Sequence, residues 1–532
     1  MIKSEWIVDM TVVLIYFTIV LVTGLVMSRK YHGSSANDFL SGGKDSHWFK
    51  TGLTLVAMSI DTGIMAVAGI GFVWGLTIQW NAVNLWITAP LAAMFFIPIF
   101  WRTKITTTPE LLEKRFNPAC RMLFAIVMAL ASVVVLTTLI YLGSLFLNEI
   151  FDWPLYLGAV VLFLITGLYV AMGGMKTVMA INVYQAIFMA VTIVTVAVMA
   201  VHRVGGIGAL IHIESLSKSG TLLTSTIPKV DFDLFSDHWY PIPSGIVWAI
   251  IAGTSWIACN FTMAQRLLTA RNEEHAQKAM LFLGCGHIFI FLAGYVVGVC
   301  MHELRPDTVP DKAYITVILE MFPVGIRGIL MAGLMASLLS TVDGVLTSSG
   351  TLITKDIVVR FISKSKKEKE LKTTSRLVQA VSVVCVFFIL PQVAESSTAM
   401  AFLQGFLGDI FGVIVALYLV GIFSTRVTSN AAFAAGVSGI VLGIILDVST
   451  DINFANVGII SFVYTIAAAF LLSQFEKPKS RASLQDLTVY TIPNVKGPFV
   501  GLNAWPALWK WIVGIQFLWI GLTALWEYII IN

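Results

Sequence analysis

Residues 337–344 read Ser-Leu-Leu-Ser-Thr-Val-Asp-Gly, and they lie inside an apolar run that is long enough to cross a bilayer. A helix needs about 20 apolar residues to span the hydrocarbon core. Asp343 falls near the middle of this run, where a carboxylate costs at least ~2.5 kcal/mol on insertion scales. An acid at that depth indicates a functional site inside a membrane protein.

The hydroxyl residues before Asp343 share one face of the predicted helix. The spacing i, i+3, i+4, i+7 holds for Ser337, Ser340, Thr341 and Gly344. Hydroxyl oxygens beside one acid are hard ligands that suit a small cation. Small residues also let helices pack closely, so the face alone leaves packing as an alternative. The carboxylate of Asp343 beside this face favours a cation site over simple helix packing.

The composition is that of a polytopic membrane protein. The 532 residues are 57% hydrophobic and 12% charged, with a mean hydropathy of +0.86, whereas soluble proteins carry roughly 25% charged residues. Five cysteines are scattered without metal-ligand or disulfide spacing. The apolar runs predict an all-α protein of fourteen spans, at residues 6–28, 48–75, 79–101, 120–148, 154–173, 176–202, 242–265, 276–302, 324–355, 374–394, 397–424, 428–447, 455–475 and 506–529.

The basic residues predict the orientation of these spans. If the N-terminus lies outside, most of the 34 Lys and Arg residues fall on the cytoplasmic side. The basic run 364–369 is then a cytoplasmic loop rather than a nucleic-acid patch. The first span, 6–28, is too long for a signal-peptide core and lacks a cleavage site, so we expect it to be retained. We expect a multi-pass protein of the plasma or inner membrane with both termini outside.

Two spans are expected to break near the middle of the membrane. The sequence Asp61–Gly63 interrupts the second span, and Gly253–Trp256 and Asn260 interrupt the seventh. Broken helices at matching places in two halves mark the central site of secondary transporters. The predicted domains are an N-terminal helix with a cytoplasmic loop (1–47), a first repeat of spans 2–6 (48–203), an extracellular loop (204–241), an inverted second repeat of spans 7–11 (242–425), and three C-terminal helices (426–532) with a cytoplasmic loop at 476–505.

The acids within predicted spans include Asp9, Asp61, Asp343 and Asp409. Asp9 is near the end of its span, so we expect it to be solvated. The other three have no Lys or Arg at comparable depth, and His287 is the one basic candidate, which implies mobile cations or protonation. The alternatives are a helix-break cap at Asp61, a structural bend at Asp409 and simple packing of the His287 ring.

A sodium site follows from the predicted break in the second span. Where a spanning helix unwinds, its freed carbonyl oxygens can bind Na⁺. Ala57 and Ile60 precede the break. The five predicted sodium-binding residues are Ala57, Ile60, Ser337, Ser340 and Thr341.

A solute cavity is predicted beside the same breaks. Its candidate residues are Asp61, Trp80, Asn81, Asn84, Trp256, Asn260, His287 and Gln404. Trp80 has an alternative role as a membrane-interface residue, because tryptophan is common there. The set contains no Lys or Arg, so it favours a sugar, a polyol or a zwitterion over a strongly anionic solute.

Several segments between about residues 30 and 425 carry a family resemblance. They are Thr107–Phe116, Gly173–Met175 with Asn182–Gln185, Gln265–Ala270 with Ala276–Lys278, and Ser340–Thr341 with Thr354–Asp356. With these segments the chain resembles the sodium:solute symporter family, which includes sodium/glucose, sodium/proline, sialic acid and iodide transporters. The resemblance implies a LeuT-type core of two inverted five-helix repeats and Na⁺-driven uptake by alternating access.

The resemblance also implies residue roles. It implies the same five sodium ligands, with carbonyls from Ala57, Ile60 and Ser337 and hydroxyls from Ser340 and Thr341. It places Gln404 at a substrate-contacting glutamine, His287 at the position of a sugar-binding lysine, and Trp256 where sugar transporters have a gating tyrosine.

One departure from the family pattern involves the sixth span. Asn182 stands where many members carry an aspartate, and Asp343 replaces a ninth-span hydroxyl. We hypothesise a second cation site built from Ser340, Asp343 and Asn182. The alternative is that Asp343 binds the substrate or a proton.

The predicted function is that of a sodium-coupled symporter that imports a small organic solute. Enzyme motifs are absent from the sequence, so we expect no enzymatic activity and no cofactor beyond Na⁺ as the coupling ion. The expected partners are the solute, Na⁺ and the lipid bilayer, without nucleic acid. The alternatives are proton coupling through Asp61 or Asp343 and, less favoured, a membrane sensor or a membrane-embedded enzyme.

Overall fold

The protein is built from helices. The computed structural model describes residues 6–30, 35–59, 63–218, 220–227, 231–236, 243–363, 367–396, 398–492 and 506–531. Within these ranges the only β-structure is two isolated bridges, which confirms the predicted all-α class.

The helices divide the chain as follows. The first half contains α1 (Trp6–Lys30), α2 (Ala36–Ser41), α3 (Trp48–Ser59), α4 (Gly63–Trp74), the short turn η1 (Gly75–Ile78), α5 (Gln79–Leu91), η2 (Ala92–Phe96), α6 (Ile97–Arg102), α7 (Thr108–Arg115), α8 (Pro118–Phe151), α9 (Leu155–Val204) and α10 (Ile207–Ile211). The second half contains α11 (Ser244–Thr254), η3 (Ser255–Cys259), α12 (Phe261–Leu267), α13 (Glu273–Leu304), α14 (Ala313–Met321), α15 (Ile326–Leu352), η5 (Ile353–Ile362), α16 (Glu368–Glu395), α17 (Ala399–Phe423), α18 (Ser429–Ser449), α19 (Phe454–Leu472) and α20 (Pro506–Ile531).

Many of these helices are long and apolar enough to cross a membrane. Among the described residues ten qualify, or eleven if α11 and α12 form one bent span. The 50 residues of α9 would extend roughly 75 Å at 1.5 Å per residue, far beyond a hydrocarbon core of about 30 Å. Gly174 interrupts α9 with φ 61° and ψ −163°, between the predicted fifth and sixth spans. The total of fourteen spans stays a prediction.

Helix breaks lie in the second and seventh predicted spans. α3 ends at Ser59 and α4 begins at Gly63, whose φ is +71°; residues 60–62 lie outside the described ranges. In the seventh span, α11 and η3 meet α12 at an angle of 50°. Asn260 stabilises the new start, because its side-chain oxygen accepts a 2.8 Å hydrogen bond from the backbone N–H of Thr262. The predicted break in the seventh span is confirmed.

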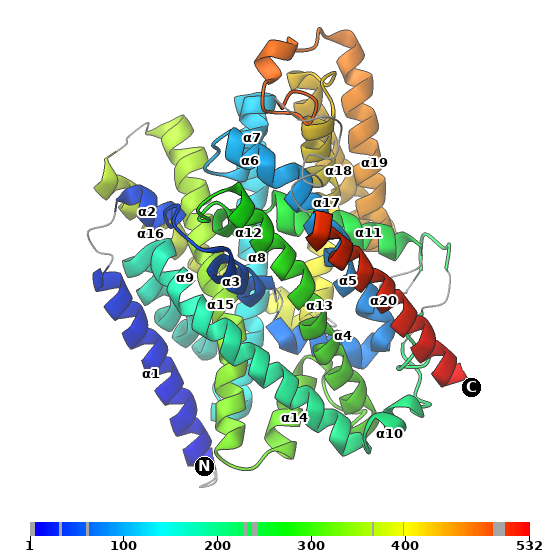
Figure 1. Cartoon of the computed structure of the whole chain (residues 1–532). Helices are drawn as coiled ribbons and strands as arrows, with labels where there is room; N and C mark the ends of the chain where they lie inside the picture. The colour runs from blue at the N-terminus through cyan, green and yellow to red at the C-terminus, as the bar shows by residue number, and fades with distance from the viewer. Residues whose placement is uncertain are drawn as a thin grey trace.

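The helix that carries residues 337–344 lies inside the bundle. Figure 1 shows α15 among α3, α8, α9 and α13, with α1 at one edge of the molecule and α20 at the opposite edge. Every residue of α15 from Leu330 to Leu352 is buried, and α9 is its most extensive neighbour. The hydroxyl face of α15 therefore meets protein on all sides.

Asp9 anchors α1 to the first turn of α15. The carboxylate is fully buried, forms an ion pair with Arg327 at 2.6 Å, and accepts 2.8 Å hydrogen bonds from the backbone N–H groups of Gly325 and Gly328. The prediction that Asp9 is solvated is wrong. The first N–H groups of a helix lack intrahelical partners and favour a negative charge, so the start of α15 takes up the carboxylate.

We expect an Asp9→Asn variant to lose roughly 3–5 kcal/mol of stability, because it leaves the Arg327 guanidinium buried without a counter-charge. Thermal unfolding of the purified protein in detergent measures the loss. Glu320→Gln is the matched control, since Glu320 pairs with Arg305 at 3.3 Å in an exposed ion pair. Equal unfolding temperatures for the two variants would contradict the anchoring role.

Candidate functional site

The predicted sodium ligands of α3 and α15 meet in the protein interior. The Ser340 Oγ lies 3.0 Å from the Ala57 carbonyl oxygen and 2.8 Å from the Ser337 carbonyl oxygen. Both carbonyl residues and both hydroxyl residues, Ser340 and Thr341, are fully buried. The Ala57 carbonyl belongs to the last described turn of α3. Ile60, the fifth predicted ligand, lies outside the described residues.

Asp343 is held by donors from α9. Its Oδ2 accepts a 2.9 Å hydrogen bond from the Tyr169 hydroxyl. The Asn182 amide donates to Asp343, and it also lies 3.3 Å from the Ser340 carbonyl oxygen. The three residues of the hypothesised second cation site, Asp343, Asn182 and Ser340, are therefore close together. Direct donors already occupy part of the carboxylate.

Arg266 lies next to Asp343, contrary to the expectation that no arginine reaches this depth. The side chain is fully buried, and its guanidinium fills the space that a Cβ at Gly344 would need. It is close enough to Asp343 for the two charges to interact. The chain bends by 50° before α12, and all seven residues of α12 are buried, so Arg266 stays inside the bundle.

A small polar cavity lies beside the breaks. It measures about 50 Å³ and contains five of the eight predicted solute residues, namely Asn81, Asn84, Trp256, His287 and Gln404. Its remaining wall includes Ser59, Gly253, Phe291 and Phe411. The cavity therefore touches the end of α3, the start of α5, the bend of the seventh span, α13 and α17.

Several polar atoms of the cavity wall lack a hydrogen-bond partner among the described residues. They are Asn84 Oδ1, Trp256 Nε1, His287 Nδ1 and Gln404 Oε1. Each of these side chains is at least nine-tenths buried. The His287 ring also stacks on Phe291 with 4.0 Å between ring centroids. Buried polar groups are normally hydrogen-bonded, so four unpaired atoms around one cavity point to a polar occupant.

Two of the predicted solute residues, Trp80 and Asn260, do not line this cavity. Trp80 points its indole N–H to the Thr226 carbonyl at 2.9 Å, and Asn260 caps α12. Asp61 lies outside the described residues. The roles of Trp80, Asn260 and Asp61 toward the solute stay predictions.

Two of the segments that carry the family resemblance meet at the predicted cytoplasmic side. Asp356, in the η5 segment that continues α15, accepts hydrogen bonds of 2.7 Å from the Thr107 hydroxyl and from Arg121 Nε. Arg121 and Arg360 also donate to Glu113 on α7, at 2.6 and 2.8 Å. Partial burial works to raise the pKa of Glu113, but the hydrogen bonds from Arg360 and Arg121 outweigh it, so the pKa lies below its usual value. The resemblance singled out these segments, but not their contact.

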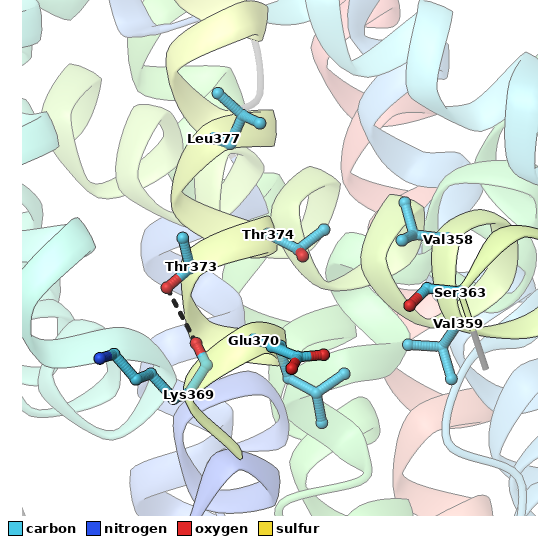
Figure 2. Close-up of a pocket in the computed structure, with 9 residues that line it drawn as sticks. Val358, Val359, Ser363, Lys369, Glu370, Thr373, Thr374 and Leu377 are labelled. Atoms are coloured by element: carbon cyan, nitrogen blue, oxygen red, sulfur yellow. Dashed lines mark hydrogen bonds between the residues drawn. The ribbon is translucent and has the colours of Figure 1, made fainter. Parts of the chain in front are cut away.

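A second, larger cavity is separate from these sites. Figure 2 shows it between the end of η5 and the start of α16, with Val358, Ser363 and Thr374 on its walls. Its volume is about 340 Å³ and its lining is mainly apolar. It contains none of the predicted ion or solute residues.

Together these features define a secondary transporter. A central helix carries an oxygen cluster, one neighbouring span is interrupted beside that cluster, and a polar cavity lies between them. The model described as the sodium:solute symporter family matches residues 39–439. The chain belongs to the sodium:solute symporter family.

Relatives and solved structures agree with this assignment. The chain is 30% identical over 477 residues to sodium/glucose cotransporter 4 of Danio rerio, covering 82% of this chain and 71% of that protein. It is 27% identical over 470 residues to a sodium/glucose cotransporter of Vibrio parahaemolyticus, covering 82% of this chain and 85% of the relative.

The structural neighbours show a LeuT-type fold. A substrate-bound, outward-open Na⁺-coupled sialic acid symporter aligns with a TM-score of 0.78 at 19% identity, over 89% of this chain and 99% of the other. The transporter MhsT in complex with L-phenylalanine aligns with a TM-score of 0.51 at 14% identity, over 80% of this chain and all of the other. The protein is a multi-pass, sodium-coupled symporter of small organic solutes and not an enzyme.

Proposed function

We propose that this symporter binds Na⁺ at Ala57, Ile60, Ser337, Ser340 and Thr341 and imports a neutral polyhydroxylated solute, such as a sugar or polyol, through the cavity at His287 and Gln404. The observation that carries the ion site is the approach of Ser340 Oγ to carbonyl oxygens from two separate helices, at 3.0 and 2.8 Å. In place of these hydrogen bonds, a Na⁺ ion would be coordinated by the same three oxygens.

Sodium binding would couple the ion gradient to the conformation of the transporter. A cation between the end of α3 and the middle of α15 stabilises the state in which these two segments are close. A ligand shifts a conformational equilibrium only by its difference in affinity for the two states. The membrane potential adds about 2.3 kcal/mol per Na⁺ for every 100 mV. Release of Na⁺ to the cytoplasm then lets α3 separate from α15 and frees the solute.

The chemistry of the cavity supports an uncharged solute. Its polar wall combines amides, an indole N–H and one imidazole, and it contains no Lys, Arg, Asp or Glu among the described residues. Hydroxyl groups both donate and accept hydrogen bonds, so a sugar or polyol can satisfy the unpaired amide oxygens and the indole N–H together. The similarity to sodium/glucose cotransporters supports the same class.

The cavity must enlarge to hold such a solute. Its 50 Å³ is far below the roughly 300–1,000 Å³ of ordinary small-molecule sites. The structure therefore has the compact arrangement of a transporter between its open states.

We further propose the plasma or inner membrane as the location of the protein, with both termini outside and α2 and α7 on the cytoplasmic side.

Proton coupling through Asp61 or Asp343 is the alternative. Asp343 is buried and could carry a proton, but it lies beside Arg266 and outside the solute cavity. The second cation site at Asp343, Asn182 and Ser340 stays a prediction. The neighbouring guanidinium opposes it, because like charges repel strongly in a medium of low polarity.

We expect Ser340→Ala to raise the Na⁺ concentration for half-maximal uptake about tenfold or more, since a lost ligand of this kind is worth about 1.4 kcal/mol. Uptake by proteoliposomes at fixed voltage and pH, with Na⁺ varied, measures the shift. Ser349→Ala is the matched control, because the Ser349 hydroxyl bonds its own helix at the Leu346 carbonyl. Equal Na⁺ dependence in the two variants would refute the proposed sodium site.

We expect neutral sugars or polyols to raise the unfolding temperature of the purified protein in NaCl but not in KCl, whereas carboxylates and zwitterions do not. Gln404→Leu should weaken the effect about tenfold or more, because it removes a polar partner from an enclosed site. A thermal-shift screen with matched concentrations of the three solute classes makes the comparison. Stabilisation by carboxylates alone would overturn the proposed solute class.

We expect Asp343→Asn to lower the unfolding temperature while the Hill coefficient for Na⁺ stays at the wild-type value, because the carboxylate balances Arg266. The double variant Asp343→Asn/Arg266→Gln should regain part of the lost stability, since it removes the uncompensated charge. A Hill coefficient that falls in Asp343→Asn would instead establish the second cation site.

A further inference from the structure

The connection between α10 and α11 contains an ordered hairpin. Leu216 and Leu222 form an antiparallel bridge, and backbone N–H groups of Ser217 and Leu223 donate to Thr221 and Ser215 at 2.7 and 3.0 Å. Leu223 is fully buried. Local hydrogen bonds and one buried leucine therefore give this part of the predicted extracellular loop, 204–241, a defined shape.

The hairpin docks on the junction between α4 and α5. The backbone N–H of Leu76 donates to the Leu223 carbonyl at 2.7 Å, and the N–H of Lys218 donates to the Val73 carbonyl at 3.0 Å. Gly75 makes this approach possible, because its φ is +72° and a Cβ there would lie 2.4 Å from the Leu223 carbonyl oxygen. No other residue type fits this position without displacing the hairpin.

The end of α20 holds the segment 224–227, which follows the hairpin. Oε1 of Glu527 accepts hydrogen bonds from the Thr226 hydroxyl at 2.7 Å, the Ile227 N–H at 2.8 Å, the Ser225 hydroxyl at 3.0 Å and the Thr226 N–H. Glu527 is only 8% exposed. Burying a carboxylate is costly unless donors replace its water, and these four donors do so.

On the side away from Glu527, the segment 224–227 contacts the start of α5. The Thr226 carbonyl accepts hydrogen bonds from Trp80 Nε1 at 2.9 Å and Gln79 Nε2 at 3.4 Å. The next residue, Asn81, lines the solute cavity. Thr226 therefore connects the carboxylate of α20 to the first turn of the helix that supplies part of the cavity wall.

The body of α20 is fixed to α5 independently of Glu527. The Trp519 ring meets the Trp86 ring edge-on at 5.5 Å between centroids, and the Gln516 amide donates to the Trp86 carbonyl. Trp526 adds a 2.9 Å hydrogen bond from its indole N–H to the Thr224 carbonyl. Loss of the Glu527 charge should therefore loosen residues 225–227, which donate to it, while α20 stays in place.

We propose that Glu527 is a positioning residue for transport: it holds residues 224–227 across the first turn of α5 and so keeps the solute cavity closed on the side of this loop. The inference rests on the proposed solute cavity. A solute enters that cavity only when its walls separate, and the first turn of α5 is the part of the wall that the loop holds. Opening on this side then requires the hydrogen bonds around Thr226 to break.

The test measures access to the cavity directly. A cysteine introduced at Ala252, which lines the cavity, is labelled with a water-soluble maleimide in the purified full-length chain in detergent, where the reagent reaches both faces. We expect Glu527→Gln to speed labelling about tenfold relative to the same cysteine in the wild-type background. Hydrogen–deuterium exchange at the amides of 223–227 should rise with it. Glu320→Gln, which removes a carboxylate from the exposed ion pair with Arg305, should change neither quantity.

Each outcome decides the proposal. Faster exchange with unchanged labelling means that Glu527 only stabilises the loop, and unchanged exchange means that it does not hold the loop; either result overturns the inference. If Glu527→Gln does not fold, Trp526→Phe removes the hydrogen bond to the Thr224 carbonyl and keeps an aromatic ring at this position, and it should accelerate labelling several-fold. Labelling needs neither Na⁺ nor solute, so a failure of the proposed function in the thermal-shift screen is distinguishable from a failure of this inference.

Discussion

The structure depends on the approach of one hydroxyl, that of Ser340, to carbonyl oxygens from two helices. The Ala57 carbonyl lies in the last described turn of α3, in the interior of a bundle where water cannot satisfy a free carbonyl. Ser340 donates a hydrogen bond to it. The same contact brings together the oxygens that would bind Na⁺ at the proposed sodium site.

Buried charges hold α15 and the η5 segment that continues it. The start of α15, its middle and η5 each involve an arginine and an aspartate from different helices, in the sets Asp9–Arg327, Asp343–Arg266 and Asp356–Arg121. Buried pairs add little net stability compared with apolar packing, but breaking one is costly. They therefore fix the register of α15 and η5 against α1, α12 and α8. With the register fixed, a cation at the proposed sodium site would act on the distance between α3 and α15.

The sequence predicted the fold class, the hydroxyl face and most of the cavity, because each depends on local pattern. Small hydroxyl residues at helical spacing stay on one face wherever the helix packs, and five of eight predicted solute residues surround one cavity. The partners of the buried acids were not predictable in this way. The local pattern does not pair Arg266 with Asp343 or Arg327 with Asp9, because the bend before α12 and the packing of α1 against α15 bring these groups together.

Polar contacts at the two ends of the bundle differ in kind from the buried pairs. Glu113 and Arg360 lie toward the predicted cytoplasmic edge, where Arg360 is partly exposed, and Glu527 holds a loop at the other end of the cavity-forming helices. Water can replace the hydrogen bond of the partly exposed Arg360 when it breaks, so the contact of Arg360 with Glu113 costs much less to break than one in the interior. The Glu527 carboxylate is buried, but all of its donors lie on one loop, so its hydrogen bonds are lost together when that loop moves. A transporter must open at one end and then the other while its core keeps its register. The buried pairs around α15 suit the constant part of that cycle, and the contacts of Glu113 and Glu527 suit the parts that alternate.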